Sequence, residues 1–183
     1  MPSETMPRFT FWILLGFLSA GLAQKPGSKE YLTQEEITKI QDAQEIDARA
    51  KLYLEFAALR LRVAEARLWG KESAAGDPLE FFSVPDMLEG YYRIVRSLMI
   101  SLDDAYQKPH IERERVVKAL KSLKESTGKA LEDLEVLKKF AEEKKLEDVW
   151  NLAEQALDIT RGAREGAELG LAAQPQEKKK KRP

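Results

Sequence analysis

Residues 47–69 constrain the fold most, because a helix over this stretch carries apolar side chains on two opposite sides. One stripe advances in alternating steps of four and three residues, and it consists of Leu52, Phe56, Leu59, Val63 and Ala66. The opposite stripe recurs every seven residues, at Leu54, Leu61 and Leu68. A surface helix needs one apolar stripe, so a helix with two has neighbours on both sides. We expect the central helix of a bundle; in the alternative, the Leu54, Leu61 and Leu68 side contacts a second protein molecule.

Three further long helices are predicted over residues 84–107, 111–143 and 145–169, each with an unbroken rhythm of apolar residues. A short helix precedes them over residues 33–44, where Thr33 and Glu36 fit a capping box. No run of alternating β-branched residues occurs after residue 23, so no sheet is expected. The pattern predicts an all-α fold: an elongated up-and-down bundle of four long helices with a short leading helix, coiled-coil-like packing and antiparallel neighbours.

Polar and helix-breaking residues mark the ends of these helices. Asp47 is expected to cap the central helix, and Ser83 to cap the helix that follows it. Residues 70–82 form the clearest loop. Fraying is expected at the end of the last helix, which contains Gly162, Gly166 and Gly170.

The first 23 residues are typical of a secretory signal peptide. Arg8 supplies a positive charge before the uncharged, mostly apolar residues 9–23, and Gly21 and Ala23 are small residues at the positions a signal peptidase requires. Cleavage is expected between Ala23 and Gln24. The apolar run is shorter than the roughly 20 residues that span a bilayer as a helix. We therefore expect an exported protein, periplasmic or secreted, without a transmembrane helix after cleavage; an uncleaved anchor and a buried N-terminal helix are the alternatives.

Charge divides the remaining chain unevenly. We expect a flexible linker over residues 24–32, the bundle domain over residues 33–171 and a disordered basic tail over residues 172–183. Residues 24–176 carry 24 basic and 29 acidic side chains. The basic side chains of the tail are Lys178, Lys179, Lys180, Lys181 and Arg182. Behind a signal peptide such a run does not indicate nucleic acid. It predicts either a weak, salt-sensitive contact with an anionic surface or a solubilising end without a function of its own.

The sequence contains no arrangement of residues that is typical of catalysis. It has no cysteine and one histidine, His110, which excludes thiolate sites and leaves too few ligands for a zinc or di-iron centre. Phosphate-binding glycine motifs and calcium loops are also absent. We expect no enzyme activity, no cofactor and no metal. Arg49, Arg60 and Arg67 share one flank of the central helix. We expect them to pair with acidic residues of a neighbouring helix or to extend their charged ends over the bundle edge; an anionic partner is the alternative.

Three hypotheses of function follow. In the first, an exported helical bundle acts as an interaction or structural module of the cell envelope, through the second stripe of the central helix or through Tyr91, Tyr92, Phe81 and Phe82, with a protein partner or by self-association. In the second, the basic tail binds an anionic surface or a polyanion. In the third, the bundle is a small-ligand carrier or an enzyme whose site is not visible in the sequence.

Overall fold

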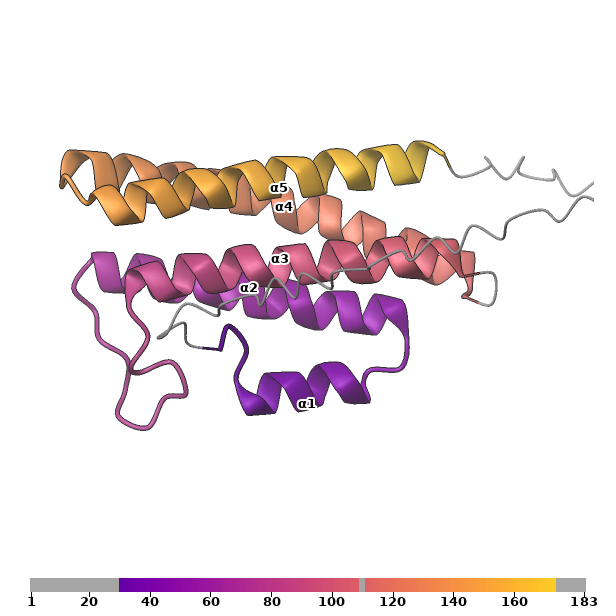
Figure 1. Cartoon of the computed structure of the whole chain (residues 1–183), viewed down its shortest axis with the longest axis horizontal. Coiled ribbons are helices and arrows are strands. Elements are labelled where there is room, and N and C mark those ends of the chain that lie inside the picture. The colour runs from indigo at the N-terminus through magenta and orange to yellow at the C-terminus, as the bar shows by residue number, and fades with distance from the viewer. Residues whose placement is uncertain (1–29, 109–110, 174–183) are drawn as a thin grey trace, which may run out of the picture.

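A computed structural model describes residues 30–108 and 111–173, and over these ranges the chain contains five helices and no strand. The helices are α1 (Gln34–Asp42), α2 (Ile46–Leu68), α3 (Val84–Gln107), α4 (Arg113–Glu143) and α5 (Glu147–Ala172), as Figure 1 shows. The predicted all-α bundle of four long helices with a short leading helix is confirmed. In the part of the chain that the structure describes, no helix is long and apolar enough to cross a bilayer.

The four long helices run alternately in opposite directions along the bundle (Figure 1). They pack as two antiparallel hairpins, α2 with α3 and α4 with α5, and the hairpins stack so that α3 lies against α5 and α2 lies against α4. The expectation that all successive helices are close neighbours is wrong for α3 and α4, which share few contacts. α3 and α4 run in opposite directions, but the apolar faces of the helices decide which of them pair.

Capping side chains define two of the helix starts. At α1, the Glu36 backbone N–H donates to Thr33 Oγ1 at 3.2 Å, and the Thr33 N–H donates to Glu36 Oε2 at 2.8 Å. Ser83 and Asp86 form the same reciprocal box at the start of α3. The predicted cap at Asp47 is wrong, because α2 begins one residue earlier, at Ile46. Asp47 lies in the first turn of α2, where its carboxylate accepts a hydrogen bond from Arg115 of α4 at 3.3 Å.

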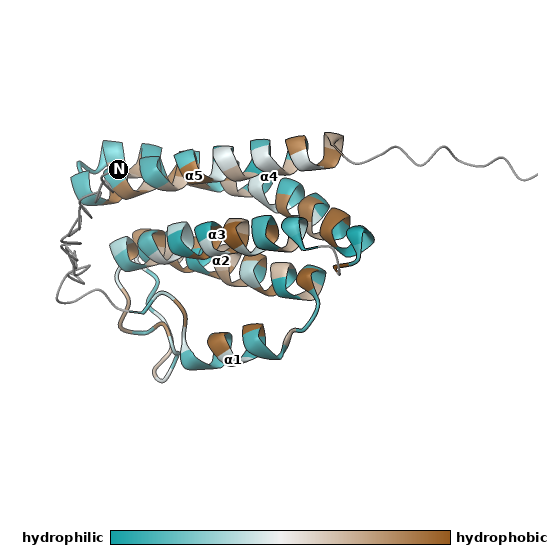
Figure 2. Cartoon of the chain, turned by 45° about the vertical axis from the view of Figure 1, so that its right-hand side comes forward, coloured by the Kyte–Doolittle hydropathy of each residue, from teal (hydrophilic) through white to brown (hydrophobic). Residues whose placement is uncertain are grey.

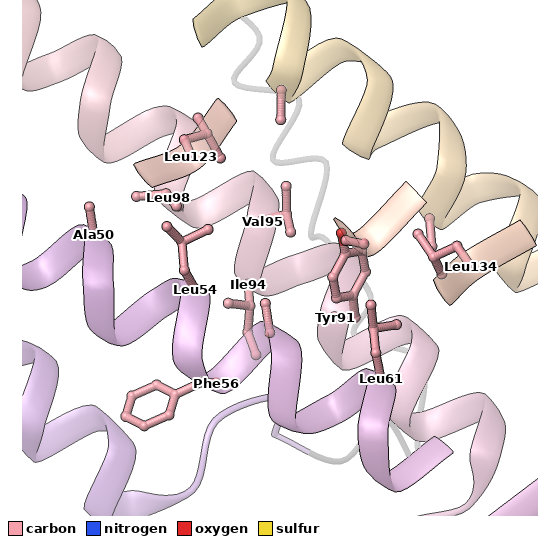
Figure 3. Close-up of a cluster of buried hydrophobic side chains, with 14 of the residues drawn as sticks. Ala50, Leu54, Phe56, Leu61, Tyr91, Ile94, Val95, Leu98, Leu123 and Leu134 are labelled. Atoms are coloured by element: carbon pink, nitrogen blue, oxygen red, sulfur yellow. The ribbon is translucent and has the colours of Figure 1, made fainter. Parts of the chain in front are cut away.

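The core is built on the side of α2 that carries the seven-residue stripe. Leu54 and Leu61 are buried, and both project towards α3, as the close-up in Figure 3 shows. Phe56 lies on the opposite side of α2, where it is also buried. The rest of its stripe is only half buried, at Leu52, Leu59, Val63 and Ala66. Both apolar sides of α2 therefore have neighbours, and the seven-residue side has the more complete cover.

The ends of the predicted domains shift in the structure. Tyr31 and Leu32, expected in the linker, pack on the bundle: Leu32 is buried, and the Tyr31 hydroxyl lies 3.1 Å from Ser97 Oγ of α3. The expected fraying of the last helix does not occur, since α5 continues through its glycines to Ala172. At Gly170 an added Cβ would come within 3.0 Å of Leu120 Cδ1, so this glycine lets α5 pack closely on α4.

Candidate functional site

Arg60 is the most deeply buried charged side chain among the described residues, with 1% of its surface exposed. Its guanidinium donates to both carboxylate oxygens of Glu36, at 2.8 and 2.6 Å, and to the Tyr31 carbonyl at 2.9 Å. A Cβ at Gly90 of α3 would lie 3.5 Å from Arg60 Nε, so α3 covers the guanidinium closely. These hydrogen bonds fix α1 and the segment before it to α2.

The other two arginines of this flank hold connecting segments in the same way. Arg49 donates two hydrogen bonds to the carbonyl of Ala43, which lies in the connection between α1 and α2. Arg67 donates to the carbonyls of Leu79 and Glu80, in the loop between α2 and α3. Pairing with a neighbouring acidic residue is confirmed for Arg60 alone. Each of the three guanidinium groups donates hydrogen bonds within the fold.

The predicted partner contact on α2 is closed to a partner. Leu54 and Leu61 are 9% and 3% exposed, and Leu68 is half buried against the core. α2 packs against both α3 and α4. Exposing these leucines would require the bundle to open.

The Tyr91 region is divided between the core and the surface. Tyr91 is 2% exposed, its hydroxyl lies 2.7 Å from Thr160 Oγ1 of α5, and burial raises the pKa of that hydroxyl. Tyr92 and Phe82 are half buried, and Phe81 is 80% exposed. Phe81 alone of this group presents a large apolar surface to solvent. The remaining candidates (Ala23, Gln24, His110 and Lys178, Lys179, Lys180, Lys181, Arg182) lie outside the described residues.

A groove between α3 and α5 has a volume of about 470 Å³. We call it the α3–α5 groove. Its α3 wall consists of Met99, Ile100, Leu102, Asp103 and Tyr106. Its floor is Val116, Leu120 and Leu123 of α4, and its α5 wall is Ala163, Gly166, Ala167 and Gly170. Figure 1 shows that α5 and α3 stand apart at this end of the bundle, while α4 passes behind them.

The shape of the groove follows from side-chain size. The α5 wall contains only alanine and glycine, so no side chain of that helix fills the space facing α3. An added Cβ at Gly166 would meet no atom within 4 Å, which shows that the wall opens to solvent there. The floor leucines are buried at its base. The result is an apolar slot with large residues on one wall and small residues on the other.

Apolar surface continues beyond the slot onto its edges. Ile100 and Tyr106, on the α3 wall, are 61% and 44% exposed. Leu169, next to Gly170 on α5, is 72% exposed. Figure 2 shows hydrophobic residues in the last turns of α5, at the end where it stands apart from α3. Exposed apolar residues that cluster around a concavity are typical of an interaction site, whereas single ones are not.

The polar groups at the groove are few. Of the twelve residues that line it, Asp103 alone carries a formal charge. Its carboxylate accepts a hydrogen bond from the Gln107 side-chain amide at 3.1 Å, and among the described residues it forms no ion pair within 4 Å. At the end of the groove, the Arg113 guanidinium lies 6.0 Å from the centre of the Tyr106 ring. This arrangement can bind an apolar surface and attract one cationic group, but it offers no nucleophile paired with a base.

The described residues also contain no cluster of three or more histidine, cysteine, aspartate or glutamate side chains placed to hold a metal ion. Sequence reasoning missed the groove. The sequence signal of the groove is the glycine series of α5, which faces the apolar side of residues 99–106; locally the same glycines predict only a weakened helix end. Comparisons of the chain with models of protein families, with curated proteins and with solved structures found no match.

Proposed function

We propose that the chain is an exported, non-catalytic helical-bundle module that binds a protein partner through the α3–α5 groove. The observation that carries the proposal is the combination of an apolar groove with strongly exposed Ile100 and Leu169 at its edges. Leaving this much apolar surface in water costs free energy, and a partner that covers it recovers that free energy. Export is supported by the signal-like pattern of residues 1–23.

The geometry favours a surface for macromolecules over a catalytic site. Among the described residues that line it, the groove has one charged side chain and one tyrosine, with no histidine or cysteine. Catalysis requires a positioned acid, base or nucleophile within hydrogen-bonding reach of its partner, and within the described residues the side-chain hydrogen bond of Asp103 comes from the Gln107 amide. The elements that form the groove are long helices capped or packed along their lengths, which gives the site a rigid frame.

The test is affinity capture from native envelope extract with three baits: residues 24–183, residues 24–176, and residues 24–183 with Gly166→Phe. Phenylalanine at position 166 fills the slot, and its Cβ has free space, so the helix remains intact. A protein retained by the first two baits in high salt and lost from the third supports the proposal. A matched bait with Gly162→Phe, one turn away and outside the groove lining, should retain it.

Two results contradict the proposal. If the Gly166→Phe bait retains the same proteins as the unmodified bait, then the groove is not the contact surface. If material is retained only by the bait that includes residues 177–183, and only at low salt, the basic tail makes the contact and the polyanion hypothesis replaces this one.

A further inference from the structure

The form of the α3–α5 groove indicates what kind of molecule fills it. Its α3 wall runs from Met99 to Tyr106, which is about 10 Å at the helical rise of 1.5 Å per residue. Its α5 wall has the same length, from Ala163 to Gly170, and both helices point the same way along the bundle (Figure 1). The two walls are parallel helical segments, each two turns long, and the floor is a third helix. Such a groove can bind two turns of a further helix.

The exposed edges favour a helix over a small apolar molecule. A small molecule that fills the 470 Å³ slot leaves Leu169, which does not line the slot, in water. A helix has a diameter of about 10 Å with its side chains, so its flanks extend past the slot and cover Ile100 and Leu169 together. The glycine and alanine wall of α5 allows the close approach of backbones that helix packing over small residues requires.

The charges at the groove indicate which kind of partner helix it favours. Asp103 is the one charged residue of the lining, and among the described residues it has no ion-pair partner. The carbonyl ends of α3 and α5 meet the N-termini of α2 and α4 at this end of the bundle, so the helix dipoles oppose one another and the Asp103 carboxylate is the charge that a partner meets in the groove. Arg113 is placed at the Tyr106 ring, beyond Asp103 along the wall.

We propose that the partner segment is a basic amphipathic helix. Its apolar residues, spaced at i, i+3 or i+4, and i+7, lie in the slot against Leu120 and Leu123, and one of its lysines or arginines pairs with Asp103. This inference rests on the proposed function, because it names the partner of the same groove. It adds a chemical class that the proposed function leaves open.

The test uses three synthetic peptides of about 18 residues, long enough to form a helix, with leucines at the helical spacing and lysine, glutamate or glutamine elsewhere. Each is labelled and titrated with the protein produced from the complete 183-residue sequence, and binding is followed by fluorescence anisotropy. The lysine peptide should bind tightest, and the glutamate peptide weakest. Asp103→Asn should weaken the binding of the lysine peptide about fivefold, as expected for the loss of one partly exposed ion pair. It should leave the affinity of the glutamine peptide unchanged.

Two matched controls separate the groove from general attraction. Asp104→Asn removes the neighbouring carboxylate, which pairs with Lys108 and does not line the groove, so it should leave the affinity of the lysine peptide unchanged. Gly166→Phe should abolish binding of the lysine peptide, and Gly162→Phe should not. Circular dichroism and thermal unfolding of each variant confirm that the bundle remains folded.

The remaining outcomes overturn the inference. Equal affinity of the three peptides, all lost in Gly166→Phe, means that the groove binds helices without selecting charge; the inference then fails and the proposed function stands. Binding of the lysine peptide that survives Gly166→Phe means that the groove is not the site, and both fail. A protein that is dimeric by light scattering and becomes monomeric in Gly166→Phe, without binding any peptide, identifies a second copy as the occupant.

Discussion

Removing Arg60 should destabilise the protein more than any other single change of a charged residue among those described. The Glu36 carboxylate has 8% of its side chain exposed, so Arg60→Met leaves it buried without its cation. Breaking a buried ion pair from one side costs about 3–5 kcal/mol, because the remaining charge is neither solvated nor paired. A domain of this size is stable by about 5–15 kcal/mol, so this loss is a large fraction of the total.

The double variant Glu36→Met, Arg60→Met separates the cost of an unpaired charge from the value of the pair. With both charges removed, the apolar replacements fill the space between α1, α2 and Gly90. The free energy of unfolding should then fall by about 0–2 kcal/mol relative to the unmodified protein. The double variant also loses the Glu36 half of the α1 capping box, worth about 1 kcal/mol. Even with that loss, the double variant should be more stable than Arg60→Met alone, because it leaves no unpaired buried charge.

The assay is urea unfolding followed by circular dichroism, with the free energy extrapolated to water at constant slope. Native-state hydrogen exchange of the α1 amides adds the local view, because α1 contacts only α2 among the helices and should open first in Arg60→Met. The reasoning is refuted if Arg60→Met costs less than about 1 kcal/mol, the range of an exposed pair, or if the double variant is the least stable of the three.

Other changes test separate parts of the fold. Gly166→Ala should raise the free energy of unfolding by about 0.5–1 kcal/mol, because its added Cβ meets open space. Gly170→Ala should raise it less, because its Cβ would lie 3.0 Å from Leu120 Cδ1. Equal increases in the melting temperature of the two variants would contradict the close approach at Gly170. Ser83→Ala should cost about 1 kcal/mol through loss of the α3 capping box, measured by urea unfolding with exposed Ser122→Ala as the control. Burial raises the Tyr91 pKa above its unfolded value, so the stabilisation from its neutral form is complete below about pH 10 and is lost as the pH rises further. The unfolding free energy should thus fall more steeply above pH 10 in the unmodified protein than in Tyr91→Phe, and parallel curves would refute the burial argument.

The helices of this protein follow from local sequence rules, which is why most of them could be predicted. The rhythm of apolar residues located α2, α3, α4 and α5, and Thr33 and Ser83 marked two helix starts where a side chain caps the backbone. The start of α2 was misplaced by one residue because Glu45 precedes the helix without a side-chain hydrogen bond, leaving no local signal for that boundary.

The pairing of helices and the groove depend on contacts between distant residues, which no local rule contains. The two stripes of α2 predicted neighbours on both sides, but not that α3 and α4 take one side and α1 the other. Arg60 was assigned to a flank with Arg49 and Arg67, yet only the fold shows that Glu36 reaches it. Gly166 and Gly170 weaken an isolated helix. In the bundle, Gly170 lets α5 pack closely on Leu120 of α4, and Gly166 leaves open space in the groove wall.

The central claim is that the α3–α5 groove contacts a partner in the cell, and site-specific photo-crosslinking tests it most directly. A photoreactive amino acid is placed at Ile100, which lines the groove and is 61% exposed, or at Val136 of α4, which is 54% exposed and lies outside it. In cells that produce the protein, irradiation should yield a discrete protein adduct from position 100 and none from position 136. An adduct from Val136 alone, equal adducts from both positions, or none from Ile100 would contradict the account.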